Sequence, residues 1–333
     1  MVSKHRKFEL LDRIVQAVND DGWNVLYVSD AHYHPFVLKI YRGNESHIIR
    51  VYIWNLTHGG GAARAKDEYR IQITGVDIFQ PQPQGKTIIL GWWNEGEVFA
   101  GFDFNKHTDP LGFSPSIQIK ESALRKAYLN DFAPWTKDNE EIAIAFRPDF
   151  FVEYVRNLES LHSFGESAQD LEVLEEVLAN PDQVNNTVIQ TVSEERRTTV
   201  AMVKKKIRDN SFKSRVLTSY QKKCAFCGVQ LKLIDAAHIV PVEDNGTDET
   251  SNGIALCALH HRAYDRMLVT CTEDYSVVYN EKKMANLQRI GLDGGAEDFI
   301  QMLLPMIVIP PAHTDRPHVE YIRQANQIRG WNL

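Results

Sequence analysis

The sequence predicts an α+β protein made of two domains, and three observations carry this prediction. Segments with the composition and alternation of strands occur among helical segments up to about residue 160. Two pairs of cysteine or histidine residues, each with two residues between its members, lie between positions 224 and 260. With 333 residues, 43% of them hydrophobic, the chain is long enough to form a core in each domain.

The first domain, over residues 1–160, is predicted to be a mixed sheet flanked by helices. Residues 1–20 are charged and repeat apolar side chains at helical spacing, which indicates an amphipathic helix and not a secretory signal. A helix is also expected over 121–130, a strand over 141–146 and a helix over 148–161. Strand-like segments lie at residues 23–28, 36–41, 47–54, 69–73 and 87–93.

Two features of this domain suggest that it recognises DNA, and each has a plain alternative. A glycine-rich segment at residues 57–64 leaves the backbone free to approach DNA, with Arg64 and Arg70 as contacts; otherwise it is an ordinary mobile loop. A set of aromatic residues could line a pocket for a flipped base, or it could be the packed core of the sheet. The set is Trp54, Trp92, Trp93, Phe99, Phe102 and Phe104.

Residues 161–207 are predicted to be a charged helical linker. Between residues 166 and 195 there are eight acidic residues and no lysine or arginine, whereas residues 196–223 hold ten basic residues and one acidic residue. A solvated helix face explains the acidic run best. The net charge of -7 does not indicate a nucleic-acid ligand, but a segregated basic run can contact phosphates. The expected phosphate contacts are Lys204, Lys205, Lys206, Arg208, Lys213 and Arg215.

The paired metal-ligand residues predict a structural zinc site. Cys224 and Cys227 form the first pair, and Cys257 and His260 form the second. Soft ligands paired at this spacing suit a tetrahedral Zn²⁺ that stabilises a region with little core of its own. Cys271, the remaining cysteine, is the alternative fourth ligand.

The same region resembles the HNH nuclease family. The resemblance rests on A-H-I-V-P, which contains His238, and on N-G-I-A-L-C-A-L-H-H, which contains Asn252 and His261, and it covers about residues 208–280. It implies a ββα-metal finger, and we expect this nuclease domain with a helical tail to occupy residues 208–333. The segment before Cys224 and the tail are similar to those of HNH proteins described as predicted restriction endonucleases.

The resemblance also implies roles for individual residues. His238 would be the general base and Asn252 would hold the loop beside it. His261 and Asp265, four residues apart on one helix face, would bind a catalytic Mg²⁺ or Mn²⁺. The family usually has a metal ligand directly before the base, where this chain has an alanine. Asp235 is the substitute that we expect, because it lies two positions earlier on the same strand face.

Together these patterns predict a DNA endonuclease of restriction or phage-defence type, with DNA selected by sequence or by base modification. Its partners would be double-stranded DNA and a second copy of the chain, and its location the cytoplasm, without a membrane segment. Two alternatives stay open. One is a catalytically inactive zinc finger that only binds nucleic acid or another protein. The other is a nuclease centre made by Asp103, Gln118 and Lys120.

Overall fold

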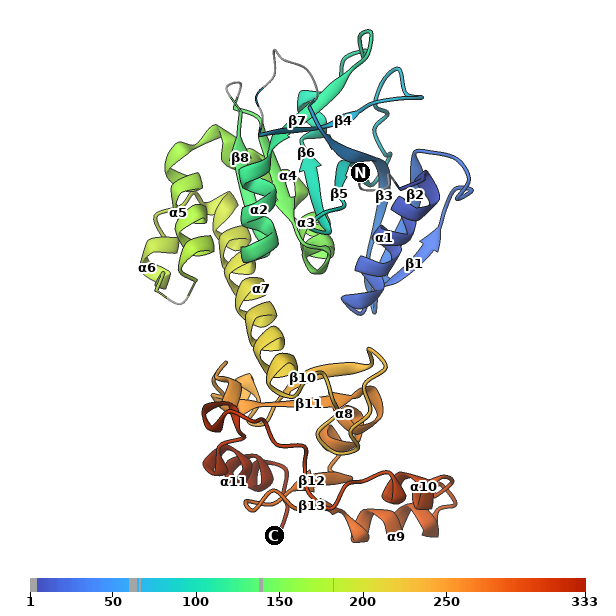
Figure 1. Cartoon of the computed structure of the whole chain (residues 1–333), viewed down its shortest axis with the longest axis vertical. Coiled ribbons are helices and arrows are strands. Elements are labelled where there is room, and N and C mark those ends of the chain that lie inside the picture. The colour runs from blue at the N-terminus through green and yellow to red at the C-terminus, as the bar shows by residue number, and fades with distance from the viewer. Residues whose placement is uncertain (1–4, 60–64, 66, 138–139, 182) are drawn as a thin grey trace. The chain divides into compact units, whose positions relative to one another are not determined.

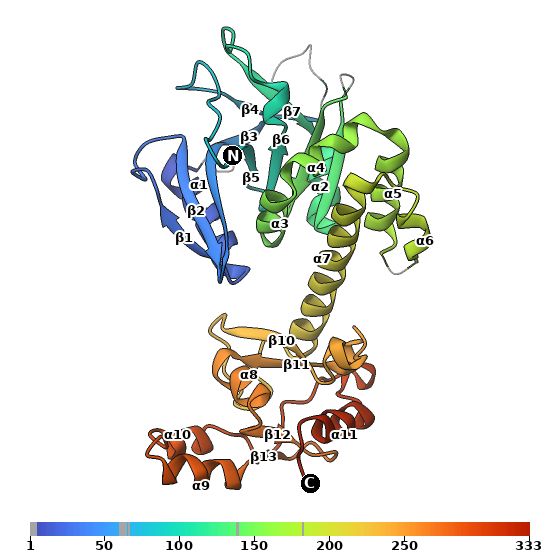
Figure 2. The same ribbon diagram turned by 180° about the vertical axis from the view of Figure 1, so that it is seen from behind.

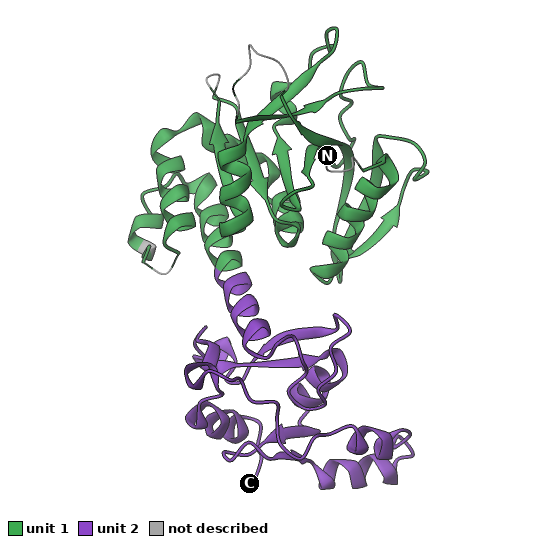
Figure 3. Ribbon diagram, in the orientation of Figure 1, with its two compact units in different colours: residues 1–207 green, residues 208–333 purple. Residues whose placement is uncertain are grey.

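The computed structural model describes residues 5–59, 65, 67–137, 140–181 and 183–333. The chain divides into two compact units, residues 1–207 and residues 208–333, which are coloured separately in Figure 3. Helix α7 (Glu194–Ser219) continues through the boundary between them. No helix in the described ranges is both long and apolar enough to cross a lipid bilayer.

Unit 1 is built on a nine-stranded mixed sheet. Seven strands follow one another in the order β1-β2-β3-β5-β6-β9-β8, and β4 joins β3 to β7 beside this path. The pair β3 and β5 is parallel, and the other pairs are antiparallel. The strands are β1 (Asn24–Tyr27), β2 (Phe36–Arg42), β3 (Glu45–His58), β4 (Glu68–Gln72), β5 (Lys86–Trp93), β6 (Val98–Phe102), β7 (Ser116–Lys120), β8 (Phe132–Thr136) and β9 (Ile142–Phe146) (Figure 1).

Both faces of the sheet are covered, because its central strands are apolar on both sides. In β3, Val51 and Ile53 belong to one core, whereas Tyr52 and Trp54 belong to the other, as strand alternation requires. Helix α1 (Lys7–Asp20) buries its apolar stripe in the first core. Helix α2 (Glu121–Asn130) packs on the second core. The α+β prediction is therefore confirmed.

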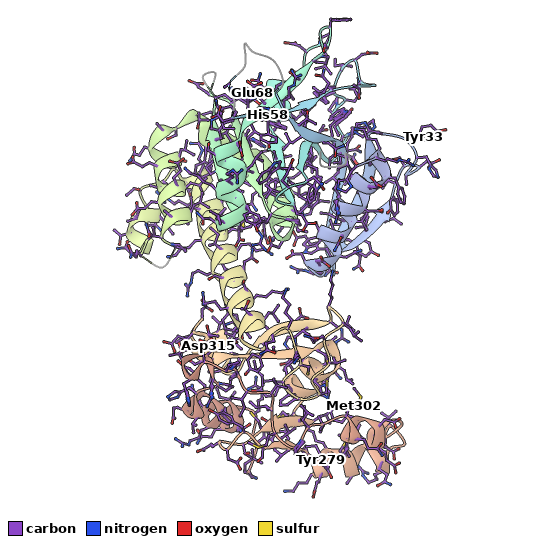
Figure 4. All side chains as sticks on the ribbon, in the orientation of Figure 1. Tyr33, His58, Glu68, Tyr279, Met302 and Asp315 are labelled. Atoms are coloured by element: carbon purple, nitrogen blue, oxygen red, sulfur yellow. The ribbon has the colours of Figure 1, made fainter. Side chains whose placement is uncertain are left out.

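The aromatic residues singled out in the sequence are core residues. Trp92, Phe99 and Phe102 are at most 1% exposed, and Trp54 and Trp93 at most 5%. Phe104 is partly buried against the second core. They serve packing, so the base-pocket interpretation of this set is wrong. Large apolar side chains do reach the surface elsewhere in the molecule, as Tyr33 does in unit 1 and Met302 in unit 2 (Figure 4).

The segment predicted as a linker contributes to the core of unit 1. Its helices include α5 (Ala168–Ala179), which buries Val173, Leu174 and Val177 in the first core. Arg196 of α7 forms an ion pair with Asp170 at 2.9 Å, and burying this pair lets the charged helices pack together. The segment also contains α6 (Asn186–Ile189) and the second half of α4 (Leu158–Ser163), which follows α3 (Phe151–Arg156). Helices α4, α5 and α6 lie around the start of α7 (Figure 1, Figure 2).

Unit 2 contains two strands followed by a helix: β10 (Ile234–His238), β11 (Gly253–Cys257) and α8 (Ala258–Asp265). The strands pair antiparallel with His238 opposite Gly253, and α8 contacts both (Figure 2). A side chain at Gly253 would meet Val216 of α7 at 2.2 Å, so glycine lets α7 pack against β11. The remaining elements are β12 (Val269–Cys271), β13 (Val277–Tyr279), α9 (Glu281–Arg289), α10 (Ala296–Gln301) and α11 (Val319–Ile328).

Candidate active site and metal centre

Four predicted zinc ligands lie together in unit 2. Cys224 and Cys227 lie in the turn after α7, Cys257 ends β11, and His260 lies in the first turn of α8. Their ligand atoms are all within 4.8 Å of one another. Nδ1 of His260 lies 3.2 Å from Sγ of Cys257 and 3.6 Å from Sγ of Cys224. The turn and the strand-to-helix junction thus direct three sulfurs and one imidazole nitrogen to one point.

The protonation chemistry of this cluster suits Zn²⁺. Burial raises the pKa of Cys224 to about 12 and also raises the pKa of Cys227, so a thiolate there needs a cation beside it. Burial lowers the pKa of His260, which keeps its imidazole neutral and able to bind a metal. The cluster could therefore hold tetrahedral zinc. Cys271, the alternative fourth ligand, lies buried in β12 and is not part of this cluster.

His238 is the last residue of β10, and two neighbours fix its ring. Nε2 lies 3.1 Å from Oδ1 of Asp248. The ring of Phe212 stacks on the imidazole, with 3.9 Å between ring centroids and an interplanar angle of 3°. The side chain of His238 is 24% exposed, so solvent reaches it although one face is covered.

Asn252 ties down the loop that follows His238. It is fully buried, and its side-chain oxygen accepts a hydrogen bond from Val240 N at 2.9 Å. Its Nδ2 donates to the carbonyl oxygens of Val240 and Thr247, at 3.1 and 2.8 Å. Its own carbonyl accepts from Ile239 N at 2.8 Å. One amide side chain thus bonds to both ends of the loop that leads from the base to Asp248.

His261 and Asp265 are close together on α8, where Nε2 of the histidine lies 3.8 Å from a carboxylate oxygen of the aspartate. Their side chains are 33% and 59% exposed. Asp235 instead faces Lys213 of α7, at 3.6 Å. Among the described residues, the zinc cluster is the one place where three or more such ligands converge. The structure therefore does not gather Asp235 with the other two predicted ligands of the catalytic metal.

The residues predicted to contact DNA lie in different settings. Arg64 is outside the described residues. Arg70 lies on β4, and the other six lie on α7. Lys206 pairs with Asp21 at 2.5 Å, and Lys204 donates to the carbonyl of Val184. Lys205 is exposed.

Arg208 and Arg215 are both engaged by one residue that sequence reasoning missed. Nη2 of Arg208 bonds to Oδ2 of Asp248 at 2.6 Å, and Nη2 of Arg215 bonds to its backbone carbonyl at 2.6 Å. With Phe212, these arginines have the spacing i, i+4, i+7, a helical pattern that could have pointed to one shared face. Asp248 itself gave no signal, since Asp244 and Glu249 lie in the same polar loop.

The residues of the rival nuclease centre are not brought together. Asp103 lines a pocket of about 190 Å³ with Lys86 and His162, and neither Gln118 nor Lys120 lines it. The carboxylate of Asp103 instead accepts a hydrogen bond from Asn105 N. Lys120 pairs with Asp67 at 2.8 Å. The geometry gives this centre no support.

Comparison with known proteins divides the chain in the same way. Residues 224–270 match a family model described as HNH endonuclease, and residues 47–155 match one described as Methylase-associated X1. No curated protein matches the chain. One similar solved structure is titled "Modification dependent TagI restriction endonuclease". It has 12% sequence identity and a TM-score of 0.29, over 83% of this chain and 80% of that one.

Proposed function

We propose, because residues 224–270 match a family model described as HNH endonuclease, that the chain is a metal-dependent DNA endonuclease of a restriction or phage-defence system. The observation that carries the proposal is the setting of His238. It ends the first strand of the ββα unit, is fixed by two neighbours, and precedes a loop that Asn252 holds.

Hydrolysis of a phosphodiester requires an activated water, neutralisation of charge on the phosphate and help for the leaving 3′ oxygen. His238 would take the proton from the attacking water, because a neutral imidazole accepts protons near physiological pH. Mg²⁺ or Mn²⁺ held by His261 and Asp265 would supply positive charge beside the phosphate and the leaving oxygen. The products would carry a 5′ phosphate and a 3′ hydroxyl.

His261 and Asp265 provide only part of the ligand set that Mg²⁺ or Mn²⁺ requires. One imidazole and one carboxylate are a small ligand set, but Mg²⁺ usually keeps several waters and uses one or two carboxylates. The zinc cluster would have a different task, because its four ligands would complete the tetrahedral coordination of a zinc ion and leave no position for substrate. We assign zinc to folding and the second ion to chemistry.

Unit 1 would select the DNA. The family model that matches residues 47–155 is described as methylase-associated, which supports a nuclease that works beside DNA methylation. Recognition of a DNA sequence and recognition of a modified base are both consistent with a methylase-associated domain. A single ββα site cuts one strand, so double-strand cleavage would come from a homodimer or from two successive nicks.

A second candidate function is binding without cleavage. An alanine precedes His238, and Asp235 pairs with Lys213 away from the other predicted ligands, so within the described ranges no third protein ligand joins His261 and Asp265. A zinc finger of this kind would bind DNA and leave it intact with Mg²⁺, Mn²⁺, Co²⁺ or Ni²⁺.

The deciding experiment is cleavage of two plasmids, one unmodified and one with modified cytosine, in Mg²⁺ or Mn²⁺. Wild type should cut at least one of them and His238→Ala neither. His313→Ala, which removes an exposed histidine of unit 2, is the matched control and should cut like wild type. Cleavage by His238→Ala would remove this residue as the base. Intact DNA with every protein and metal would favour the binding function.

A further inference from the structure

We infer that α7 positions the catalytic base through Asp248, so that Nδ1 of His238 is the nitrogen that takes the proton from water. In this arrangement Arg208 and Arg215 are positioning residues. They hold Asp248, and they are not phosphate contacts. The inference rests on the proposed function, because it assigns residues to the reaction proposed there.

The first step is the shared face of α7. Arg208, Phe212 and Arg215 follow one another at four and three residues, so their side chains leave the helix on one side. Phe212 is 3% exposed and stacks flat against the imidazole of His238. The two arginines reach Asp248 from the helical turns before and after Phe212. One helix face therefore contacts both the base and the base's partner.

The second step is the tautomer of His238. A carboxylate paired with an arginine is ionised and can only accept hydrogen bonds. Nε2 of His238 must therefore carry the hydrogen that lies between it and Oδ1 of Asp248. In the neutral ring the lone pair then belongs to Nδ1. Within the described part of the chain Nδ1 has no hydrogen-bond partner, which leaves it available to a water.

The third step is the immobility of Asp248. Its Oδ1 bonds to His238, its Oδ2 bonds to Arg208, and its backbone carbonyl bonds to Arg215. Charged hydrogen bonds of this kind are shorter and stronger than neutral ones. The carboxylate cannot rotate without losing one of them, so it keeps the imidazole in one orientation.

The test compares two quantities that positioning and phosphate contact affect differently. The first is the single-turnover cleavage rate with enzyme in excess over plasmid, and the second is DNA affinity across salt concentrations, measured in a His238→Ala background so that the DNA stays intact. Asp248→Ala and Arg208→Ala should lower the rate by about 10- to 100-fold, the range found when a hydrogen-bond partner of a metal-bound histidine is removed. Their affinity and salt slope should stay unchanged.

Two comparison variants calibrate these readouts. Lys205→Ala removes an exposed lysine of the same helix, and as a phosphate contact it should reduce the salt slope by about 1. Arg289→Ala removes an exposed arginine of unit 2 and should change neither quantity. Nitrogen-15 chemical shifts of the imidazole should show the Nε2–H tautomer in wild type and a mixture of tautomers in Asp248→Ala.

Each outcome separates this inference from the proposed function. If His238→Ala still cuts, His238 is not the base, and the mechanism in the proposed function fails together with the positioning inference. If His238→Ala is inactive but Asp248→Ala cuts at the wild-type rate, only the positioning inference fails. A lower salt slope with an unchanged rate for Arg208→Ala would make that arginine a phosphate contact. Should Asp248→Ala lose zinc or helical signal, Arg208→Ala gives the same decision, because its side chain is 44% exposed.

Discussion

Replacing Asn252 by alanine should loosen the loop between the base and Asp248 without unfolding unit 2. The substitution removes three hydrogen bonds from a fully buried side chain. At about 1 kcal/mol for each neutral hydrogen bond, the loop should lose about 3 kcal/mol of stability against local opening. Since 1.4 kcal/mol is a factor of ten, this corresponds to roughly a 100-fold larger open population.

The amide hydrogen of Ile239 is a suitable reporter of this opening. It donates to the backbone carbonyl of Asn252, which the substitution leaves in place. Under conditions where exchange follows the opening equilibrium, its protection should fall by roughly 100-fold. Asn286→Ala, an exposed amide of α9, is the control and should leave the protection unchanged. Wild-type protection of Ile239 in Asn252→Ala would show that the side chain does not hold the loop.

Three further predictions follow from the metal sites and from a partly buried histidine of unit 1. Cys257→Ser should abolish zinc binding and destabilise unit 2, whereas Cys271→Ser should still bind one zinc ion. Native mass spectrometry measures the bound zinc, and loss of the ion in both variants would place Cys271 among the ligands. Asp265→Asn should raise the Mg²⁺ concentration needed for cleavage, and Asp235→Asn should not. If only Asp235→Asn raised that concentration, Asp235 and not Asp265 would be the metal ligand. Partial burial of the imidazole lowers the pKa of His34 to about 3, and the positive charge of the Lys7 ammonium contributes a smaller part of this shift. Because the unfolded chain titrates near 6.5, the unfolding free energy of unit 1 should fall as pH decreases from about 6.5 to about 3. Tryptophan fluorescence in urea should show this fall, and it should be smaller in His34→Gln; a fall of undiminished size in that variant would contradict the assignment.

Local sequence patterns were sufficient to predict the zinc ligands and the elements that are encoded by neighbouring residues. The paired ligands of the zinc site are three residues apart within each pair, so their spacing on a turn and on a helix start can be recognised directly. The helix over 121–130 was predicted with the bounds that α2 has, because its apolar repeat and ends are encoded within it. Alternation likewise located most strands.

What the sequence could not supply depends on contacts between distant segments. Strand β8 was missed because Pro134 lies at its centre, and an edge strand tolerates proline since one of its sides needs no ladder. Arg208 and Arg215 were predicted to contact phosphates from their positive charge alone. An arginine that binds phosphate and an arginine that binds Asp248 carry the same charge, so charge does not distinguish the two roles. That distinction required knowing which acidic residue lies opposite the helix.

The continuity of α7 limits how this nuclease can be transplanted. The segment that matches the HNH family begins at residue 224, after the helix has ended. A cassette cut there and fused to another DNA-binding module would carry every zinc ligand and His238 itself, but not the aromatic ring or the arginines that orient the base. The smallest portable cutting module therefore starts no later than Arg208. Because Val200, Val203 and Ile207 of the same helix are core residues of unit 1, an engineered junction should lie between Ile207 and Arg208.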